Sequence, residues 1–384
     1  MDDVFKLLAQ ARGELENPAP TTVPKMPWGP YNHTLSLELE KHWPFSLLAG
    51  KGLRHSNGVV PAIHSMAMWC SEMLLLGTDL FIIPSLAFAQ IEAGGYDALE
   101  VTIVHGIQAY ECVPIEPDTF ICPKDALPDC APVRVVFEHN RFIEKWYDGT
   151  AALAQQFRQE DVICDLTADV KLDPRGAEKR KQRREDIRRA LLLNTSVPVE
   201  MPISFVIPTR PNILATASGF IFSKQALIQP HNETPEFRNV VETLALLDKF
   251  NGSRSLHLVV DRIGNSRPAT APVDRALDLG MALEMLLMHE NGSNPTSNQE
   301  ISNKLASRAA WLLCRDGSVD DRLEYFKLAK AMYDHRSKAA HTGQLKDKTF
   351  NPIGAEAFVV LILKKILTAG RFPDWSRIVL GEEF

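Results

Sequence analysis

The sequence has little cysteine, and its cysteines are not arranged in close pairs. The six cysteines are spread over the chain at Cys70, Cys112, Cys122, Cys130, Cys164 and Cys314. Zinc sites typically use cysteine or histidine ligands that are separated by only a few residues. The spacing therefore argues against a zinc site and predicts buried, unlinked thiols.

Long uncharged hydrophobic runs are missing as well. The most apolar tract, residues 73–91, contains Asp79 and Pro84, and we expect a buried helix and strand there rather than a membrane span. Residues 1–14 mix polar and apolar side chains and lack the basic start and apolar centre of a secretory signal. These absences predict a cytoplasmic protein without membrane association.

The chain has no excess of positive charge. It carries 42 Lys and Arg against 48 Asp and Glu, and its formal net charge is −6. This balance excludes a uniformly basic surface for nucleic acid, so nucleic-acid binding would require a local patch. The content of 45% hydrophobic and 23% charged residues is typical of a folded protein with sizeable cores.

The length of 384 residues favours two domains over one. Residues 1–233 alternate proline-rich loops with runs of β-branched residues, which predict a mixed α+β domain. Strands are expected at 99–105, 133–139, 162–167 and 205–207, and helices at 62–76 and 141–159. No role can be assigned to this domain from its sequence.

Residues 234–384 have a helical pattern and form the second expected domain. Helices are predicted at 237–250, 256–263, 272–289, from Thr296 or Ser297 to Cys314, at 319–341 and at 353–368. Asn291-Gly292, Asp316-Gly317, Gly343 and Ala369-Gly370 mark their ends. The last four helices are amphipathic, and four such helices joined by modest loops predict an all-α bundle.

A run of basic residues lies late in the first domain, at residues 178–189 (EKRKQRREDIRR), and it is expected to be helical. One interpretation is a stripe that contacts nucleic-acid phosphates. The other is a solvated helix face, which is favoured because Glu185 and Asp186 partly cancel the neighbouring positive charge.

One segment, residues 328–343 (LAKAMYDHRSKAAHTG), places a histidine five positions after an arginine near a predicted helix end. The motif from Tyr333 to His341 follows Ala282-Leu283-Glu284 and Arg308-Ala309-Ala310 on the two preceding helices. Together these segments resemble the HEPN superfamily, and within it the Apea-like branch found among bacterial defence proteins. The resemblance covers the C-terminal third, roughly residues 234–369. One departure is Thr342, which separates His341 from Gly343 where many members have His-Gly directly.

The resemblance implies a HEPN-type helical bundle that acts on RNA as a metal-independent endoribonuclease, with a role in defence against phage. Arg336, Ser337 and His341 match the catalytic pattern of that family, which commonly works as a homodimer and needs no cofactor. The alternative is a non-catalytic HEPN module that dimerises or binds a nucleotide or partner protein, because a shared fold does not guarantee chemistry. From their spacing alone, Arg336 and His341 would be read as a surface arginine and a C-capping histidine.

Arg336 and His341 have the chemistry that RNA cleavage requires. A histidine can accept or donate a proton near neutral pH, and an arginine can hold two phosphate oxygens. The negative end of the helix dipole favours protonated His341, and Ser337 could orient its ring. Because five residues correspond to about 140° of helix rotation, the two side chains do not share one face, and a two-fold dimer is expected to bring them to a common cleft.

The sequence allows two interpretations each for one carboxylate and for three tryptophans. Glu284 lies among apolar neighbours and could pair with Arg336 across the bundle or be a boundary carboxylate. Trp28, Trp43 and Trp69 could stack on bases, but core packing is the favoured interpretation.

Overall fold

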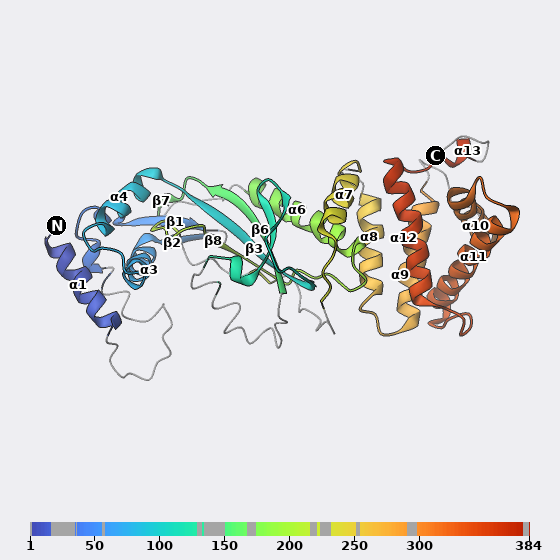
Figure 1. Ribbon diagram of the computed structural model, residues 1–384, viewed down its shortest axis with the longest axis horizontal. Helices are drawn as coiled ribbons and strands as arrows, with labels where there is room; N and C mark the ends of the chain where they lie inside the picture. Colours follow the sequence, from blue (N-terminus) through green and yellow to red (C-terminus); the bar gives the residue numbers. More distant parts are fainter. Residues whose placement is uncertain are drawn as a thin grey trace. The chain divides into compact units, whose positions relative to one another are not determined.

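The structure is a computed structural model that describes residues 2–16, 35, 37–55, 58–128, 133, 150–166, 174–215, 221–222, 232–250, 254–289, 298–378 and 384. The chain divides into two compact units (Figure 1). Unit 1 comprises residues 1–104, 108–181 and 201–226, and unit 2 comprises residues 105–107, 182–200 and 227–384. The N-terminal half thus has an α/β architecture and the C-terminal half is helical, whereas the expected boundary at residue 234 stays a prediction.

Two antiparallel sheets organise the N-terminal half. The larger sheet has the strand order β4-β5-β6-β3-β8-β9 and the smaller one the order β2-β1-β7. Their strands are β1 (Lys51–His55), β2 (Gly58–Pro61), β3 (Tyr96–Gln108), β4 (Val113–Glu116), β5 (Thr119–Pro123), β6 (Thr150–Gln159), β7 (Ile163–Asp165), β8 (Ile203–Pro208) and β9 (Ile221–Phe222). The strands expected near 99–105, 162–167 and 205–207 are confirmed.

The helices of this half are α1 (Asp2–Glu16), η1 (Phe45–Leu48), α3 (Ala62–Leu75), α4 (Ile83–Ala93), η2 (Lys124–Ala126) and the first part of α6 (Pro174–Leu193). One hydrophobic core joins α1, η1, α3 and α4 with the smaller sheet, and it contains the fully buried Leu8, Phe45, Leu53 and Met66. A second core lies on the larger sheet around Ile103. The helix expected at 62–76 is confirmed, and so is a helix over the basic run.

The helix expected at 141–159 is wrong in its second half, because residues 150–159 form β6. The strand is hydrogen-bonded between β5 and β3, and its first six residues are all buried. A strand that is covered on both faces shows no alternation of polar and apolar residues, so its alanine-rich sequence looked helical. The strand expected at 133–139 and residues 141–149 lie outside the described residues, apart from Val133.

The tract at 73–91 was expected to be a buried helix and strand. It contains the end of α3 and most of α4 instead of a strand, and Leu75, Leu76 and Phe81 are exposed.

The prediction that the cysteines are buried, unlinked thiols was partly wrong. Cys70 and Cys122 are buried, whereas Cys112 is exposed, and Cys130 lies outside the described residues.

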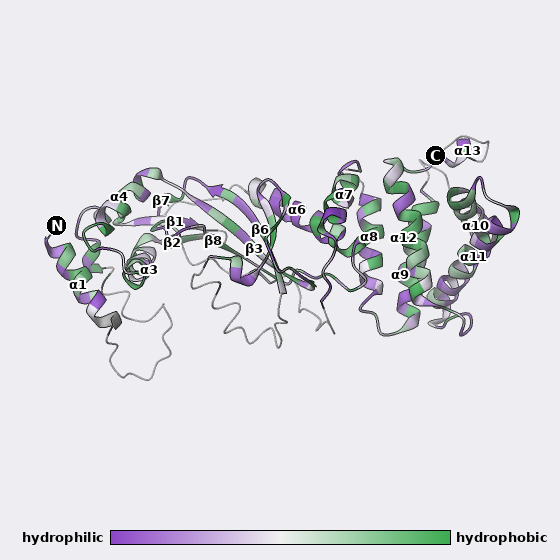
Figure 2. Ribbon diagram, in the orientation of Figure 1, coloured by the Kyte–Doolittle hydropathy of each residue, from purple (hydrophilic) through white to green (hydrophobic). Residues whose placement is uncertain are grey.

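The helices of the C-terminal half are α7 (Phe237–Asp248), α8 (Arg254–Ser266), α9 (Pro272–Leu287), α10 (Asn298–Cys314), α11 (Val319–Thr342), α12 (Pro352–Ala369) and α13 (Trp375–Ile378). They confirm the predicted succession of helices, although the proposed start at Thr296 or Ser297 and the Asn291-Gly292 turn lie outside the described residues. α9 contacts α8, α10, α11 and α12, and α10 contacts α11 and α12. In Figure 2, α12 is green over most of its length, which fits its contribution to the buried core.

The caps of α11 and α12 explain why these helices begin and end where they do. The side chain of Ser318 accepts a hydrogen bond from the backbone of Asp321, whose own side chain caps the Ser318 backbone in return. Gly343 and Gly370 adopt the left-handed conformation at the two C-termini.

None of the helices in the described part of the chain combines the length and the apolar character that crossing a bilayer needs.

Candidate functional site

Arg336 is held on the inner side of α11, against α9. Its side chain passes Gly280 so closely that a Cβ atom added there would lie 2.4 Å from Arg336 Cβ and 2.5 Å from Cγ. The glycine is therefore a requirement of the contact between α9 and α11. Sequence periodicity did not identify Gly280, because a helix pattern does not reveal which neighbouring helix approaches it.

Arg336 forms an ion pair with Glu284 of α9. The guanidinium Nη2 lies 3.0 Å from Glu284 Oε2, and the two side chains are 26% and 22% exposed. This pair confirms one of the two interpretations left open for Glu284. Burial raises the pKa of the Glu284 carboxyl above its ordinary value, and the charge of Arg336 opposes that rise. Glu284 Oε1 and Arg336 Nε are buried without hydrogen bonds in the described structure. The first can therefore accept a further hydrogen bond and the second can donate one.

His341 occupies a different environment, although it is only five residues away on the same helix. It lies exposed in the last turn of α11, two residues before the C-terminal cap at Gly343. Ser337 is half-buried one turn earlier. Within one chain the structure thus turns Arg336 toward α9 and leaves His341 at the surface, as the rotation of about 140° between them requires.

The buried histidine of this region is His335, which the sequence analysis missed. Its side chain is 5% exposed, its Nε2 lies 3.8 Å from Asp347 Oδ1, and its ring lies against Phe350 with the centroids 5.3 Å apart. Its Nδ1 is buried without a hydrogen bond in the described structure. The signal that could have revealed it is its place on the buried stripe with Met332 and Ala339.

Substituting Gly280 with alanine tests the close contact around Arg336. In an open helix, this change stabilises by about 1 kcal/mol because alanine is the better helix former. Here the new methyl group overlaps Arg336 Cβ and Cγ, so we expect a net loss of about 1–2 kcal/mol in the free energy of unfolding. Urea unfolding followed by circular dichroism would measure it. Gly13→Ala is the control, since no atom lies within 4 Å of its added Cβ, and a gain in both variants would contradict the steric argument.

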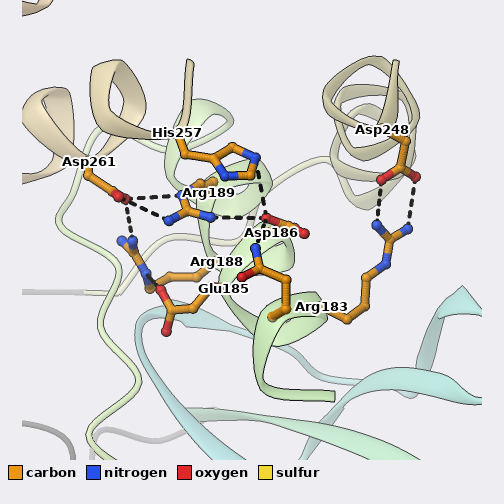
Figure 3. Close-up of polar contacts among 9 residues, drawn as sticks. Arg183, Glu185, Asp186, Arg188, Arg189, Asp248, His257 and Asp261 are labelled. Carbon is orange, nitrogen blue, oxygen red and sulfur yellow. Dashed lines mark hydrogen bonds and ion pairs between the residues drawn. The ribbon is translucent and has the colours of Figure 1, made fainter. Parts of the chain in front are cut away.

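Three arginines of the basic run, Arg183, Arg188 and Arg189, point toward carboxylates of the neighbouring helices (Figure 3). Arg183 pairs with Asp248 of α7, with a distance of 2.9 Å between Nη2 and Oδ2. Arg188 and Arg189 both bind Asp261 of α8. The distance from Arg188 Nη2 to Oδ1 is 2.6 Å, and that from Arg189 Nη2 to Oδ2 is 3.0 Å. Since these guanidiniums are bound by carboxylates, the interpretation as a phosphate-contacting stripe is not supported for them. The solvated-face interpretation holds for the exposed residues of the run, which are Glu178, Lys179, Lys181 and Gln182.

Arg188 and Arg189 also contact carboxylates of their own helix. Arg188 Nε lies 2.8 Å from Glu185 and Arg189 Nη1 lies 2.9 Å from Asp186, each one turn earlier on α6. His257 of α8 completes the cluster, with its Nε2 3.7 Å from Asp186 Oδ1 (Figure 3). We call this set the α6–α8 ion-pair cluster; it consists of Glu185, Asp186, Arg188, Arg189, His257 and Asp261. It connects two helices of unit 2.

The pKa of His257 is lowered from 6.5 by burial and by the charge of Arg189, against the opposing effect of Asp186 and Asp261. The folded state therefore binds fewer protons at His257 than the unfolded state does. We expect its contribution to stability to be complete above pH 6.5 and to be lost as the pH falls below that value. The measurement is urea unfolding at several pH values for the wild type and His257→Gln. Identical slopes of stability against pH in the two proteins would contradict this expectation.

The tryptophans do not form a base-stacking surface in the described structure. Trp69 is buried in the core, as favoured from the sequence. Trp43 is 49% exposed, so its expected burial was wrong, and its ring packs beside Phe88 with the centroids 5.1 Å apart. Trp28 lies outside the described residues.

No group of three or more His, Cys, Asp or Glu side chains placed to hold a metal ion occurs in the described part of the chain.

Comparisons with protein-family models, curated proteins and solved structures found no match to this chain. The resemblance to HEPN proteins therefore stays a prediction that depends on the residues quoted above. The structure adds one contact between those residues, because an ion pair joins Glu284 of the Ala282-Leu283-Glu284 segment to Arg336 of the 333–341 motif.

Proposed function

We propose that the C-terminal helices form a HEPN-like bundle that cleaves RNA as a homodimer, without a metal ion. The observation that carries this proposal is the placement of the Arg-x4-His word at the end of α11, with Arg336 anchored on Glu284 and His341 exposed at the helix terminus. An anchored arginine is preorganised for a phosphate, because its orientation is fixed before the ligand arrives. An exposed histidine is accessible to a second copy and to RNA.

The reaction assigns a separate role to each side chain. A base removes the proton of the ribose 2′-OH, whose oxygen then attacks the neighbouring phosphorus, and an acid returns a proton to the departing 5′ oxygen. His341 and its counterpart in the second copy are proposed for these proton transfers. Arg336 stabilises the additional negative charge on the phosphoryl oxygens, and Ser337 orients the histidine. The products would be a 2′,3′-cyclic phosphate and a free 5′ hydroxyl.

The dimer is a mechanical requirement of this proposal. In one chain the two side chains diverge by about 140°, so a single protomer does not direct both at one phosphate. A two-fold axis near the end of α11 would pair His341 of one copy with Arg336 of the other. The N-terminal domain would then sense or position a ligand, with a role in antiviral defence.

A second candidate is a non-catalytic helical module that dimerises or binds a partner. The observation that favours it is the ion pair itself, since Arg336 already has a carboxylate partner and could be structural. Incubation of the purified protein with RNA in the presence of EDTA separates the two. Cleavage that yields cyclic phosphate ends supports the nuclease, and a dimer that leaves RNA intact under these conditions supports the module.

A further inference from the structure

Two cysteines lie opposite each other at the β4–β5 hairpin. Val113 pairs with Ile121 and Pro114 with Phe120, so one more step in the same register places Cys112 opposite Cys122. Directly opposite residues of antiparallel strands point to the same face, with Cβ atoms about 4.5–5.5 Å apart. A disulfide needs a Cβ separation of about 3.5–4.5 Å, so only a small movement is required to join them.

The two thiols already interact, and their environments differ. Cys112 is exposed, whereas Cys122 is 3% exposed and its sulfur lies 3.7 Å from the carbonyl oxygen of Ala152. Burial raises the pKa of Cys122 to about 12, and a hydrogen bond and the charge of Cys112 add to the rise. Both cysteines are reduced in this structure. Solvent can thus reach one sulfur directly, and the other lies behind it.

We propose that Cys112 and Cys122 form a reversible cross-strand disulfide by exchange with a low-molecular-weight disulfide of the glutathione type. In the first step the Cys112 thiolate attacks one sulfur of the external disulfide, which gives a mixed disulfide and releases one thiolate. In the second, Cys122 loses its proton and attacks the Cys112 sulfur, which forms the internal bond and releases the second thiolate. The two cysteines lose two electrons and two protons, and the external disulfide is reduced to two thiols.

The raised pKa of Cys122 orders the two steps in time. Since the thiolate is the nucleophile, the exposed Cys112 reacts first and the closing step at Cys122 is slower. A mixed disulfide at Cys112 therefore accumulates before the internal bond forms. The bond fastens β4, which is the edge strand of the larger sheet, to β5. Amide exchange of Val113, Ile115 and Glu116 should slow on oxidation, because opening of the edge strand is restricted.

Peptide mapping tests the proposal on the full chain. The protein is treated with oxidised glutathione, its remaining thiols are alkylated, and it is cleaved on the amino side of aspartate without reduction. Cleavage at Asp97, Asp118 and Asp125 separates residues 97–117, which contain Cys112, from residues 118–124, which contain Cys122. The expected result is a linked pair of these two peptides that reduction releases.

Two variants make the result specific. Cys112→Ser should abolish the linked pair completely, whereas Cys164→Ser, on the smaller sheet, should leave it unchanged. Cys112 that carries glutathione at equilibrium without any internal bond would overturn the proposal, and so would a bond from Cys112 to another cysteine. Because Cys112 is exposed, its serine variant is expected to keep the fold, which circular dichroism checks.

Discussion

Replacing His341 with alanine is expected to lower RNA cleavage by about 10²–10⁴-fold, because a positioned acid or base contributes that much to a proton-transfer step. Arg336→Ala is expected to cost about 10²–10³-fold through lost stabilisation of the phosphoryl charge. Both rates are measured in EDTA on one labelled RNA. Arg336→Lys should recover little activity, since an ammonium lacks the planar fork that binds two oxygens.

The controls separate chemistry from folding. Thr342 is the exposed neighbour of His341, and its hydroxyl donates a hydrogen bond to the backbone carbonyl of Lys338. The variant Thr342→Ala should therefore keep wild-type activity. His341→Ala should also keep the wild-type melting temperature, because His341 is exposed. Equal cleavage by the wild type, Arg336→Ala and His341→Ala would end the nuclease proposal.

The C-terminal helices were predictable because their information is local. The capping serine at 318 follows the turn Asp316-Gly317, and Gly343 and Gly370 end the next two helices in the conformation that glycine favours. The strand β6 was not predictable in this way, because its pairing with β3 and β5 involves residues far away in the sequence. Such pairings override a local preference for helix.

The site was only half predictable for a related reason. The resemblance of residues 333–341 to HEPN proteins singled out Arg336 and His341, and the rotation of about 140° between them on a helix predicted that they diverge. The contacts of Arg336 with Gly280 and Glu284 depend on which faces of α9 and α11 meet, and a single sequence does not specify that. The basic run was interpreted from its own charges, while two further carboxylates that bind its arginines, Asp248 and Asp261, are more than sixty residues away in the sequence.

Removing Asp261 is expected to weaken unit 2 substantially. In Asp261→Ala, Arg188 and Arg189 each lose a carboxylate while their side chains stay mostly buried, at 18% and 10% exposed. Breaking a buried ion pair from one side costs about 3–5 kcal/mol, and we expect about 2–3 kcal/mol here because Asp261 is partly exposed and Glu185 and Asp186 remain. Urea unfolding gives the loss, and amide exchange should place it in α6 and α8.

The pH dependence of this loss identifies its electrostatic origin. Burial would raise the pKa of Asp261, but the guanidiniums of Arg189 and Arg188 outweigh it and hold the pKa below 3.8. The folded state thus binds fewer protons than the unfolded state, so the stabilisation is present above pH 3.8 and is lost as the pH falls through the folded pKa. The difference between the wild type and Asp261→Ala should therefore shrink in acid. Glu242→Gln, which removes an exposed pair with Arg238, should change stability by less than about 0.5 kcal/mol, and a loss as large as that of Asp261→Ala would contradict the role of burial.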